Sequence, residues 1–379
     1  FRPYRFALDI FCYFFFFTLV VRSHTNNGNM STSTNQTTTQ SSSTAADEET
    51  QRKAFKPASI APDRIAEIVL EAWNIKADPS QTTALDSYDD RNYVIVEQPT
   101  TSTTATSRSS AARKWTLKVF YVVGSRDHRD VLQAQNAAML ALRDRGVTCP
   151  IPQPTVSGES ATQYIFFTSL KVADGSELAL ALRLLSWVEG DTMQTHPHVN
   201  PDMLLEAGSF LGKIDTALDE FDEPSLHRVH AWDTAQTLGI RPFVACVTDP
   251  EVRRVVEKTL AAFEKDVVPE LQHLRQGTLM ADFNDANVIV ALNESTKQSR
   301  ISGVIDFGDM VYSRRVFDVS IAMAYAMISA YGKTGRNLAS AAILLRGFTS
   351  QYELQDSEVK LLRVLTASRL VGVENQNRD

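Results

Sequence analysis

Residues 279–290 read LMADFNDANVIV, in which two apolar segments flank a polar centre. That centre contains Asp282, Asn284, Asp285 and Asn287. A loop held by a packed scaffold can keep carboxylate and amide oxygens at fixed separations, which a solvated surface loop rarely does. The hexapeptide DFNDAN also fits a solvated turn, because Asn and Asp are common turn formers. On this stretch alone, a cation-binding loop and a plain turn both remain open.

The segment GVIDFGD at 303–309 favours the cation-binding interpretation. Asn287 follows Asp282 by five residues and Asp306 lies beyond, which is the order of a kinase signature. In phosphoryl transfer the first Asp accepts or orients the proton of the attacking hydroxyl, and the Asn and second Asp hold Mg²⁺. Magnesium prefers hard oxygen ligands, which these side chains supply. The sequence therefore predicts Asp282 as the catalytic base, with Asn287 and Asp306 as metal ligands.

A candidate phosphate contact lies upstream, in the alternating segment WTLKVF at 115–120. Lys118 falls within this predicted strand, as does the phosphate-pairing lysine of kinases. A single strand lysine is weak evidence, since most are solvated. Its position between a polar hairpin and a helix, ahead of the Asp/Asn/Asp set, favours a role on the phosphates.

The composition of the chain indicates which kinds of protein to expect. The chain has 379 residues, 43% hydrophobic and 22% charged, which is typical of a soluble protein with two lobes or domains. A formal net charge of −7 argues against a nucleic-acid partner, because such binding needs Lys and Arg to neutralise phosphates. The three cysteines, Cys12, Cys149 and Cys246, are widely spaced and the histidines form no metal-spaced set. Reduced thiols and a cytoplasmic location are the expectation.

The first part of the chain is expected to lie outside the folded unit. Residues 1–29 carry two arginines ahead of an apolar run and precede the first methionine, so we expect either upstream sequence of a gene model or a signal-like segment. The apolar run is too short to span a bilayer comfortably, so no stable membrane partner is expected. Residues 30–58 are rich in Ser and Thr and are predicted to be disordered.

The remaining sequence predicts an α+β protein with two lobes. Residues 59–188 combine an amphipathic helix near 61–73, strands around 93–96 and 114–123, a helix ending before Gly146, and further strands. A Ser/Thr-rich connection between the first two strands suggests a hairpin that tolerates insertion. Residues 189–379 are dominated by helical periodicity, with short strands around the DFNDAN motif.

Six stretches in this order resemble the aminoglycoside phosphotransferase/choline kinase-like superfamily, and within it the hydroxylysine kinases. DFNDAN followed by GVIDFGDM is the most discriminating pair. The resemblance covers roughly residues 60–375 and implies a two-lobed protein-kinase-like fold. The stretches are LDSYDDRNYVI, WTLKVF, LQAQNAAMLAL, LRLLSWVEG, ADFNDANVIV and GVIDFGDMVYS.

The resemblance implies transfer of the γ-phosphate of GTP, or ATP, to the 5-hydroxyl of 5-hydroxy-L-lysine with Mg²⁺ as cofactor. A nucleotide and a small cationic amino acid are then the expected partners, in amino-acid degradation. It implies that 87–92 replaces a glycine-rich loop and that 185–188 offers hinge backbone groups. Asp285 and Asp309 are expected on the substrate side. The nucleotide-binding residues implied are Lys118, Gln135, Ser87, Asp89, Leu185 and Trp187.

Two positions depart from the pattern of this superfamily. Met280 stands where kinase-like loops carry a histidine, and Gln135 stands where many relatives carry the glutamate that pairs with the strand lysine. Glutamine can hydrogen-bond an ammonium without neutralising it. The chain also ends where relatives continue, so we expect residues 189–379 to be truncated at the C-terminus. Alternatives are a kinase for another amino alcohol, choline or an aminoglycoside, or a catalytically impaired pseudokinase.

Overall fold

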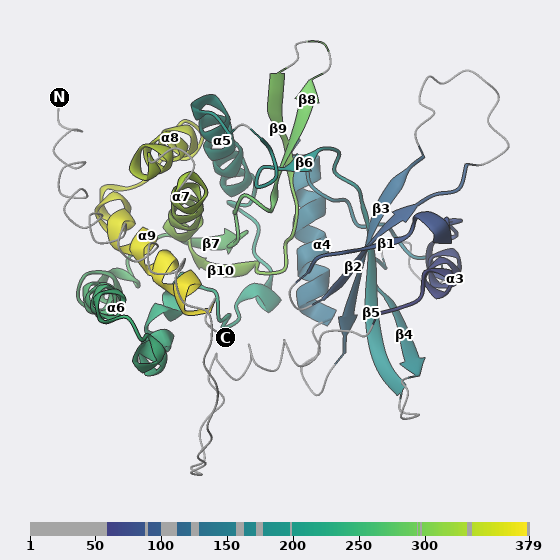
Figure 1. Ribbon diagram of the computed structural model, residues 1–379, viewed down its shortest axis with the longest axis horizontal. Coiled ribbons are helices and arrows are strands. Elements are labelled where there is room, and N and C mark those ends of the chain that lie inside the picture. Colours follow the sequence, from purple (N-terminus) through teal and green to yellow (C-terminus); the bar gives the residue numbers. More distant parts are fainter. Residues whose placement is uncertain are drawn as a thin grey trace, which may run out of the picture.

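The computed structural model describes residues 59–87, 90–99, 112–122, 129–156, 163–171, 177–197, 199–293, 295, 298–331 and 336–376. The predictions for residues 1–58 and for Asp89 lie outside these ranges. A β-sheet with two flanking helices and a mainly helical portion lie side by side (Figure 1). The α+β outline predicted from the sequence is therefore present.

The sheet contains five antiparallel strands in the order β1-β2-β3-β5-β4. Strands β2 and β3 form the predicted hairpin, in which Asn92 lies opposite Lys118. Strand β5 continues on the other side of β3 and places Arg183 opposite the same lysine. The strand bounds are β1 (Thr83–Leu85), β2 (Arg91–Val96), β3 (Lys114–Tyr121), β4 (Phe166–Lys171) and β5 (Glu177–Ser186).

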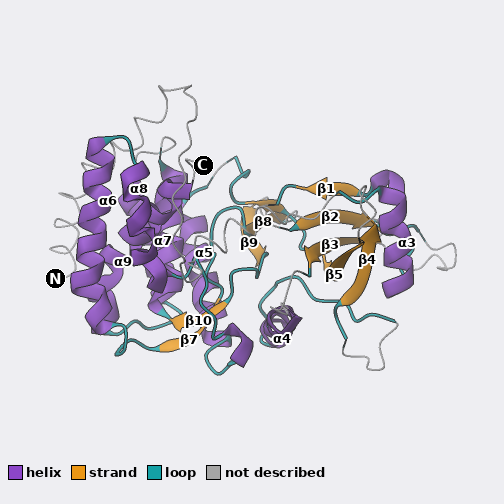
Figure 2. Ribbon diagram, turned by 90° about the horizontal axis from the view of Figure 1, so that it is seen from below, coloured by secondary structure: helices purple, strands orange, loops and turns teal. Residues whose placement is uncertain are grey.

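Helix α3 (Pro62–Trp73) covers one face of the sheet, far from the helical portion (Figure 2). Its apolar residues fall at helical spacing, and Ile65 and Ile68 are buried against the sheet residues Ile95 and Leu117. A proline in its first turn suits a helix start, because the missing N–H has no intrahelical partner there. This packing gives the sheet a core of its own.

Helix α4 (Arg129–Asp144) lies between the sheet and the helical portion (Figure 1). Its buried face includes Ala138, Met139 and Leu142, which join the core of the helical portion. Gly146 follows the helix with φ of 76°, a left-handed conformation that glycine adopts without steric cost. The helix therefore ends where the sequence predicted, and it is packed against both parts of the molecule.

Five helices form most of the second portion, and α5 and α8 cross closely. A Cβ added at Gly208 would collide with the carbonyl of Leu344, and one at Gly347 with the carbonyl of Leu205. The bounds are α5 (Pro201–Ala217), α6 (Pro250–Ala262), α7 (Val316–Ala330), α8 (Asn337–Thr349) and α9 (Asp356–Gln376). Shorter segments are 3₁₀ turns at Pro79–Gln81, Pro224–Leu226, Thr234–Cys246 and Val268–Glu270, and a π turn at Phe263–Val267.

Two small sheets carry the polar motifs. Strands β7 (Gln276–Leu279) and β10 (Val311–Arg314) pair, and β8 (Val288–Asn293) pairs with both β6 (Asp191–Thr192) and β9 (Gln298–Val304). DFNDAN therefore connects β7 to β8, and Asp306 lies between β9 and β10. The strand-like interpretation of GVIDFGD holds only to Val304, because Asp306 has φ of 61° and turns the chain.

No helix in the described part of the chain is long and apolar enough to cross a membrane.

Candidate active site

The DFNDAN loop is anchored at its start by a buried carboxylate. Asp318, in the first turn of α7, accepts hydrogen bonds from the backbone N–H groups of Met280 and Ala281, at 2.9 and 2.7 Å. Ala281 has φ of 64°, which costs an L-residue about 1–2 kcal/mol. The Met280 side chain is fully buried in the core, where it packs instead of the histidine of kinase-like loops. Asp318 thus fixes the backbone immediately before Asp282.

A second buried carboxylate lies beside Asp318. Asp215 of α5 is 0% exposed, and no described group donates a hydrogen bond to either of its oxygens; its own carboxyl donates to Asp318. Burial raises the pKa of Asp215 well above its usual range, and the charge of Asp318 adds to this effect. Burial likewise raises the pKa of Asp318 to about 6, against the lowering effect of the two backbone N–H groups. Two buried acids in contact share a proton more readily than they both ionise.

Asp282 is held by amide groups of its own loop. Its Oδ2 accepts hydrogen bonds from Asn284 Nδ2 and Asn287 Nδ2, both at 2.8 Å. Its Oδ1 accepts a hydrogen bond from Nη2 of Arg369 at 3.0 Å. Burial raises the pKa of Asp282, and the arginine charge and the amides offset part of this rise. A carboxylate with a raised pKa and a fixed orientation is suited to accept a proton.

Lys118 joins the sheet to the second polar loop. Its Nζ lies 3.1 Å from Oδ1 of Asp306 and 3.1 Å from Oδ2 of Asp90. Burial alone would lower the pKa of Lys118, but these two carboxylates raise it above its usual value, so the side chain stays charged. Asp306 shows the complementary effect, since Lys118 and the backbone N–H of Gly308 lower its pKa despite burial.

The two polar loops are connected through the backbone. The N–H of Ile305 donates to the carbonyl of Asn287 at 2.8 Å, which holds the residue before Asp306 against the end of DFNDAN. Asp306 lies close enough to Asp282 for its charge to raise the pKa of Asp282. The structure therefore brings Lys118, Asp282, Asn287 and Asp306 together, as the sequence predicted.

Gln135 is placed differently from the expectation. Its Nε2 donates to the carbonyl of Gly308 at 3.0 Å, and its Oε1 has no hydrogen-bond partner in the described residues. The partners of Lys118 are Asp90 and Asp306, so the glutamine does not bond the ammonium. Gln135 instead joins α4 to the loop after β9. Arg228 supports the same loop by donating to the carbonyls of Gly308 and Met310.

Asn287 and Asp306 each keep one oxygen suited to a cation. Nδ2 of Asn287 donates to Asp282. No described residue donates a hydrogen bond to Oδ1 of Asn287. Asp306 uses Oδ1 for Lys118 and Gly308, and its side chain is 42% exposed. Within the described ranges, no three His, Cys, Asp or Glu side chains gather as a metal site. Two protein oxygens fit Mg²⁺, which usually takes its other ligands from phosphate and water.

The remaining predicted nucleotide residues lie around the β3 and β5 strands. Ser87 donates through Oγ to the carbonyl of Asp90 at 2.8 Å and so shapes the loop before β2. Leu185 is buried near the end of β5. Trp187 follows β5, and its ring centroid lies 5.8 Å from the ammonium of Lys114. Of these three residues, only Leu185 lies within the sheet, opposite Thr116 of β3.

The two predicted substrate residues differ in their surroundings. Asp285 accepts a hydrogen bond from the hydroxyl of Ser329 on α7, which ties its side chain to the helical portion. Oδ1 of Asp309 lies 3.6 Å from Nε2 of His230. The charge of Asp309 raises the pKa of Arg369 and of Tyr325. Asp309 is therefore on the same side of Asp282 as the C-terminal helix.

Sequence reasoning missed two charged residues of the site. It did not name Asp90, whose Oδ2 lies 3.1 Å from Nζ of Lys118. It also passed over Arg369, which comes from α9 and contacts Asp282. The available indication for the arginine was a cation within an otherwise apolar helical stretch, LTASRLVGV. No feature of the sequence indicated that Asp90 would contact Lys118.

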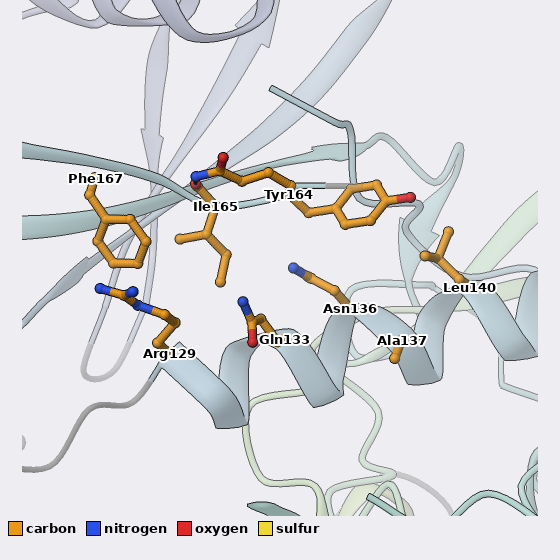
Figure 3. Close-up of a pocket in the computed structure, with 9 residues that line it drawn as sticks. Arg129, Gln133, Asn136, Ala137, Leu140, Tyr164, Ile165 and Phe167 are labelled. Carbon is orange, nitrogen blue, oxygen red and sulfur yellow. Dashed lines mark hydrogen bonds between the residues drawn. The ribbon is translucent and has the colours of Figure 1, made fainter. Parts of the chain in front are cut away.

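A cavity of about 480 Å³ lies beside α4 (Figure 3). Its lining includes Asn136, Leu140, Tyr164 and Ile165, and none of the residues described above. It is separate from the cluster around Asp282, so the chemistry is assigned to that cluster and not to this cavity.

Comparisons with known proteins agree with this geometry. Residues 103–349 match the model of the phosphotransferase enzyme family. The chain belongs to that family. This phosphotransferase is 26% identical to the hydroxylysine kinase of Bos taurus over 332 residues, covering 84% of the chain and 82% of the relative. The hydroxylysine kinase of Xenopus laevis is 26% identical over 325 residues, with 83% and 81% covered.

Solved structures show the same fold at lower identity. The amicoumacin kinase hAmiN in complex with AMP-PNP, Ca²⁺ and Ami has a TM-score of 0.58 at 14% identity, covering 88% of this phosphotransferase and 89% of that chain. A microcompartment-associated aminopropanol kinase also has a TM-score of 0.58, at 17% identity, with 83% and 89% covered. The predicted kinase-like fold, the phosphotransferase class and the resemblance to hydroxylysine kinases are confirmed.

Proposed function

We propose that this phosphotransferase transfers the γ-phosphate of GTP or ATP to the 5-hydroxyl of 5-hydroxy-L-lysine. The observation that carries the proposal is the joining of two loops, so that Asp282 lies beside Asn287, Asp306 and Lys118. The hydroxylysine kinase relatives support the choice of acceptor. AMP-PNP in the hAmiN structure supports a nucleotide as phosphate donor.

The residues of the chain divide the work of phosphoryl transfer. Asp282 orients the acceptor hydroxyl and takes its proton as the new O–P bond forms, and Asn284 and Asn287 fix the carboxylate through Oδ2. Lys118 stays charged and offers its ammonium to the phosphates. Asn287 and Asp306 would hold Mg²⁺, which neutralises charge on the phosphate oxygens when it is bound. Positioning and electrostatics then supply most of the rate enhancement.

The cytoplasm is the proposed location, with a role in amino-acid degradation. Support comes from the thiols of Cys149 and Cys246, which are both free, because cytosolic cysteines are kept reduced.

The test compares the full chain with Asp282→Asn. Each protein is incubated with Mg²⁺, GTP or ATP, and 5-hydroxy-L-lysine, choline or an aminoglycoside, and phosphorylated acceptor is measured. Asp202→Asn, exposed in the first turn of α5, is the matched control for loss of one carboxylate. We expect Asp282→Asn to lose roughly 10²- to 10⁴-fold in kcat while it still binds nucleotide, since proton transfer supplies about that factor.

Three outcomes would contradict the proposal. Transfer to choline or an aminoglycoside alone would change the acceptor class. Nucleotide binding without transfer to any acceptor would favour the pseudokinase alternative. Equal activity of Asp282→Asn and the wild type would remove Asp282 from the chemistry.

A further inference from the structure

Arg369 of α9 reaches across to the catalytic loop. Its Nη2 donates to Oδ1 of Asp282 at 3.0 Å and to the hydroxyl of Tyr325 at 3.3 Å, and its Nη1 donates to the carbonyl of Trp232 at 3.1 Å. Its guanidinium carbon lies 4.9 Å from the Trp232 ring centroid and 5.4 Å from that of Tyr325. Two aromatic rings and the base therefore hold one cation in place.

One donor of this guanidinium is left over. Nε of Arg369 is buried and has no hydrogen-bond partner in the described part of the chain. The residue is 5% exposed, so bulk water is a poor substitute partner. A buried polar group without a partner is costly, which makes Nε a donor that a ligand oxygen would satisfy. Nε and the Nη beside it form a planar pair of donors that matches the two oxygens of a carboxylate. Both Nη atoms already donate to protein groups, so a carboxylate bound there shares the Nη donor with its present acceptor.

The surroundings make the charge of the arginine permanent. Burial alone would lower the pKa of Arg369, but Tyr325, Asp282 and Asp309 raise it above its usual value. Asp309 is one of the two residues expected on the substrate side, and its charge is close enough to raise the pKa of Arg369. One cation and one carboxylate beside the base would together match an acceptor that carries both kinds of charge.

We propose that Arg369 binds the carboxylate of the acceptor and so makes this phosphotransferase selective for an amino acid over an amine. The inference rests on the proposed transfer to 5-hydroxy-L-lysine. In the chain without acceptor, Nη2 covers Oδ1 of Asp282. When a carboxylate occupies the Nε side, the guanidinium shares its charge with the acceptor, and Oδ1 becomes available to the acceptor hydroxyl.

The experiment compares two acceptors that differ by one group. 5-Hydroxy-L-lysine carries a carboxylate, and 1,5-diaminopentan-2-ol has the same hydroxyl and both amines without it. kcat and KM for each acceptor are measured with the full chain, Mg²⁺ and saturating nucleotide. The variants are Arg369→Lys, which keeps the charge but loses the planar donor pair, and Arg346→Gln, which removes an exposed cation from α8 as a control.

We expect the wild type and Arg346→Gln to prefer 5-hydroxy-L-lysine by roughly 10- to 100-fold in kcat/KM, the worth of a charge-assisted hydrogen-bond pair. Arg369→Lys should lose most of this preference through a raised KM for 5-hydroxy-L-lysine, with an unchanged KM for nucleotide. An equal fall for both acceptors, or an unchanged ratio, would overturn the proposal and leave Arg369 as a support of the loop.

A binding measurement keeps the inference testable if no acceptor is phosphorylated. L-lysine and cadaverine lack the hydroxyl and again differ by the carboxylate, so their binding to the nucleotide-loaded chain is measured by calorimetry. Tighter binding of L-lysine than of cadaverine, lost in Arg369→Lys, supports the carboxylate contact even where the proposed transfer fails. Equal binding of the two overturns it. Thermal unfolding of each variant separates a lost contact from a lost fold.

Discussion

Replacing Asp318 by Asn tests how Asp282, the proposed base, is held. The carboxylate uses both oxygens on the N–H groups of Met280 and Ala281, at 2.9 and 2.7 Å. An amide has one acceptor oxygen, so one N–H would lose its partner. A hydrogen bond to a charged group is worth about 1.5–3 kcal/mol. Because the left-handed backbone at Ala281 costs about 1–2 kcal/mol, one lost bond is enough to release that conformation. Asp282 is the next residue and would move with it.

We expect a large loss of activity with a small loss of stability. A loss of about 3 kcal/mol in positioning Asp282 corresponds to roughly 100-fold in kcat. Stability behaves differently because the pKa of Asp318 is raised from 3.8 to about 6, so ionising it in the folded chain costs about 3 kcal/mol at neutral pH. The amide removes that cost and offsets much of the lost hydrogen bonding.

The assay measures kcat at saturating nucleotide and acceptor, together with the free energy of unfolding in urea, for the wild type and Asp318→Asn. Asp202→Asn is the control, because Asp202 occupies the first turn of α5 as Asp318 does in α7, but is exposed. Full activity in Asp318→Asn would refute the reasoning. So would a fall in stability large enough to account for the loss of activity.

Two further predictions concern the other acidic contacts. Asp90→Asn should raise the nucleotide KM by roughly 10-fold with a smaller change in kcat, because Lys118 loses the more buried of its two carboxylate partners. Asp86→Asn, exposed in the same loop, should behave as wild type. Steady-state kinetics with varied nucleotide test this, and equal values for the two variants would count against it. Asp215→Asn should raise the midpoint of thermal unfolding more at pH 8 than at pH 5. The raised pKa values mean that the wild type binds extra protons when folded and loses stability as the pH rises from about 4 to about 6 and above. A shift of the same size at both pH values would show that the two acids do not share a proton.

The sequence by itself indicated the phosphotransferase class and much of the local structure. DFNDAN and the later Asp306 contain the residue types that phosphoryl transfer requires. Their order along the chain matches a kinase signature, which can be recognised without coordinates. The β2–β3 hairpin and α4 followed from alternating and helical periodicity, and Gly146 marked the end of α4. The periods of the strands and of α4 depend on neighbours within a few residues, which the sequence displays directly.

Only the tertiary structure decided which charges meet. Asp90 pairs with Lys118 and Gln135 does not, because the direction of a side chain in an irregular loop depends on how the whole segment packs. Arg369 meets Asp282 across 87 residues, a contact that exists because α9 packs against α7 and the segment containing Trp232. Such contacts are set by the packing of distant elements, and no spacing along the chain encodes the distance between them.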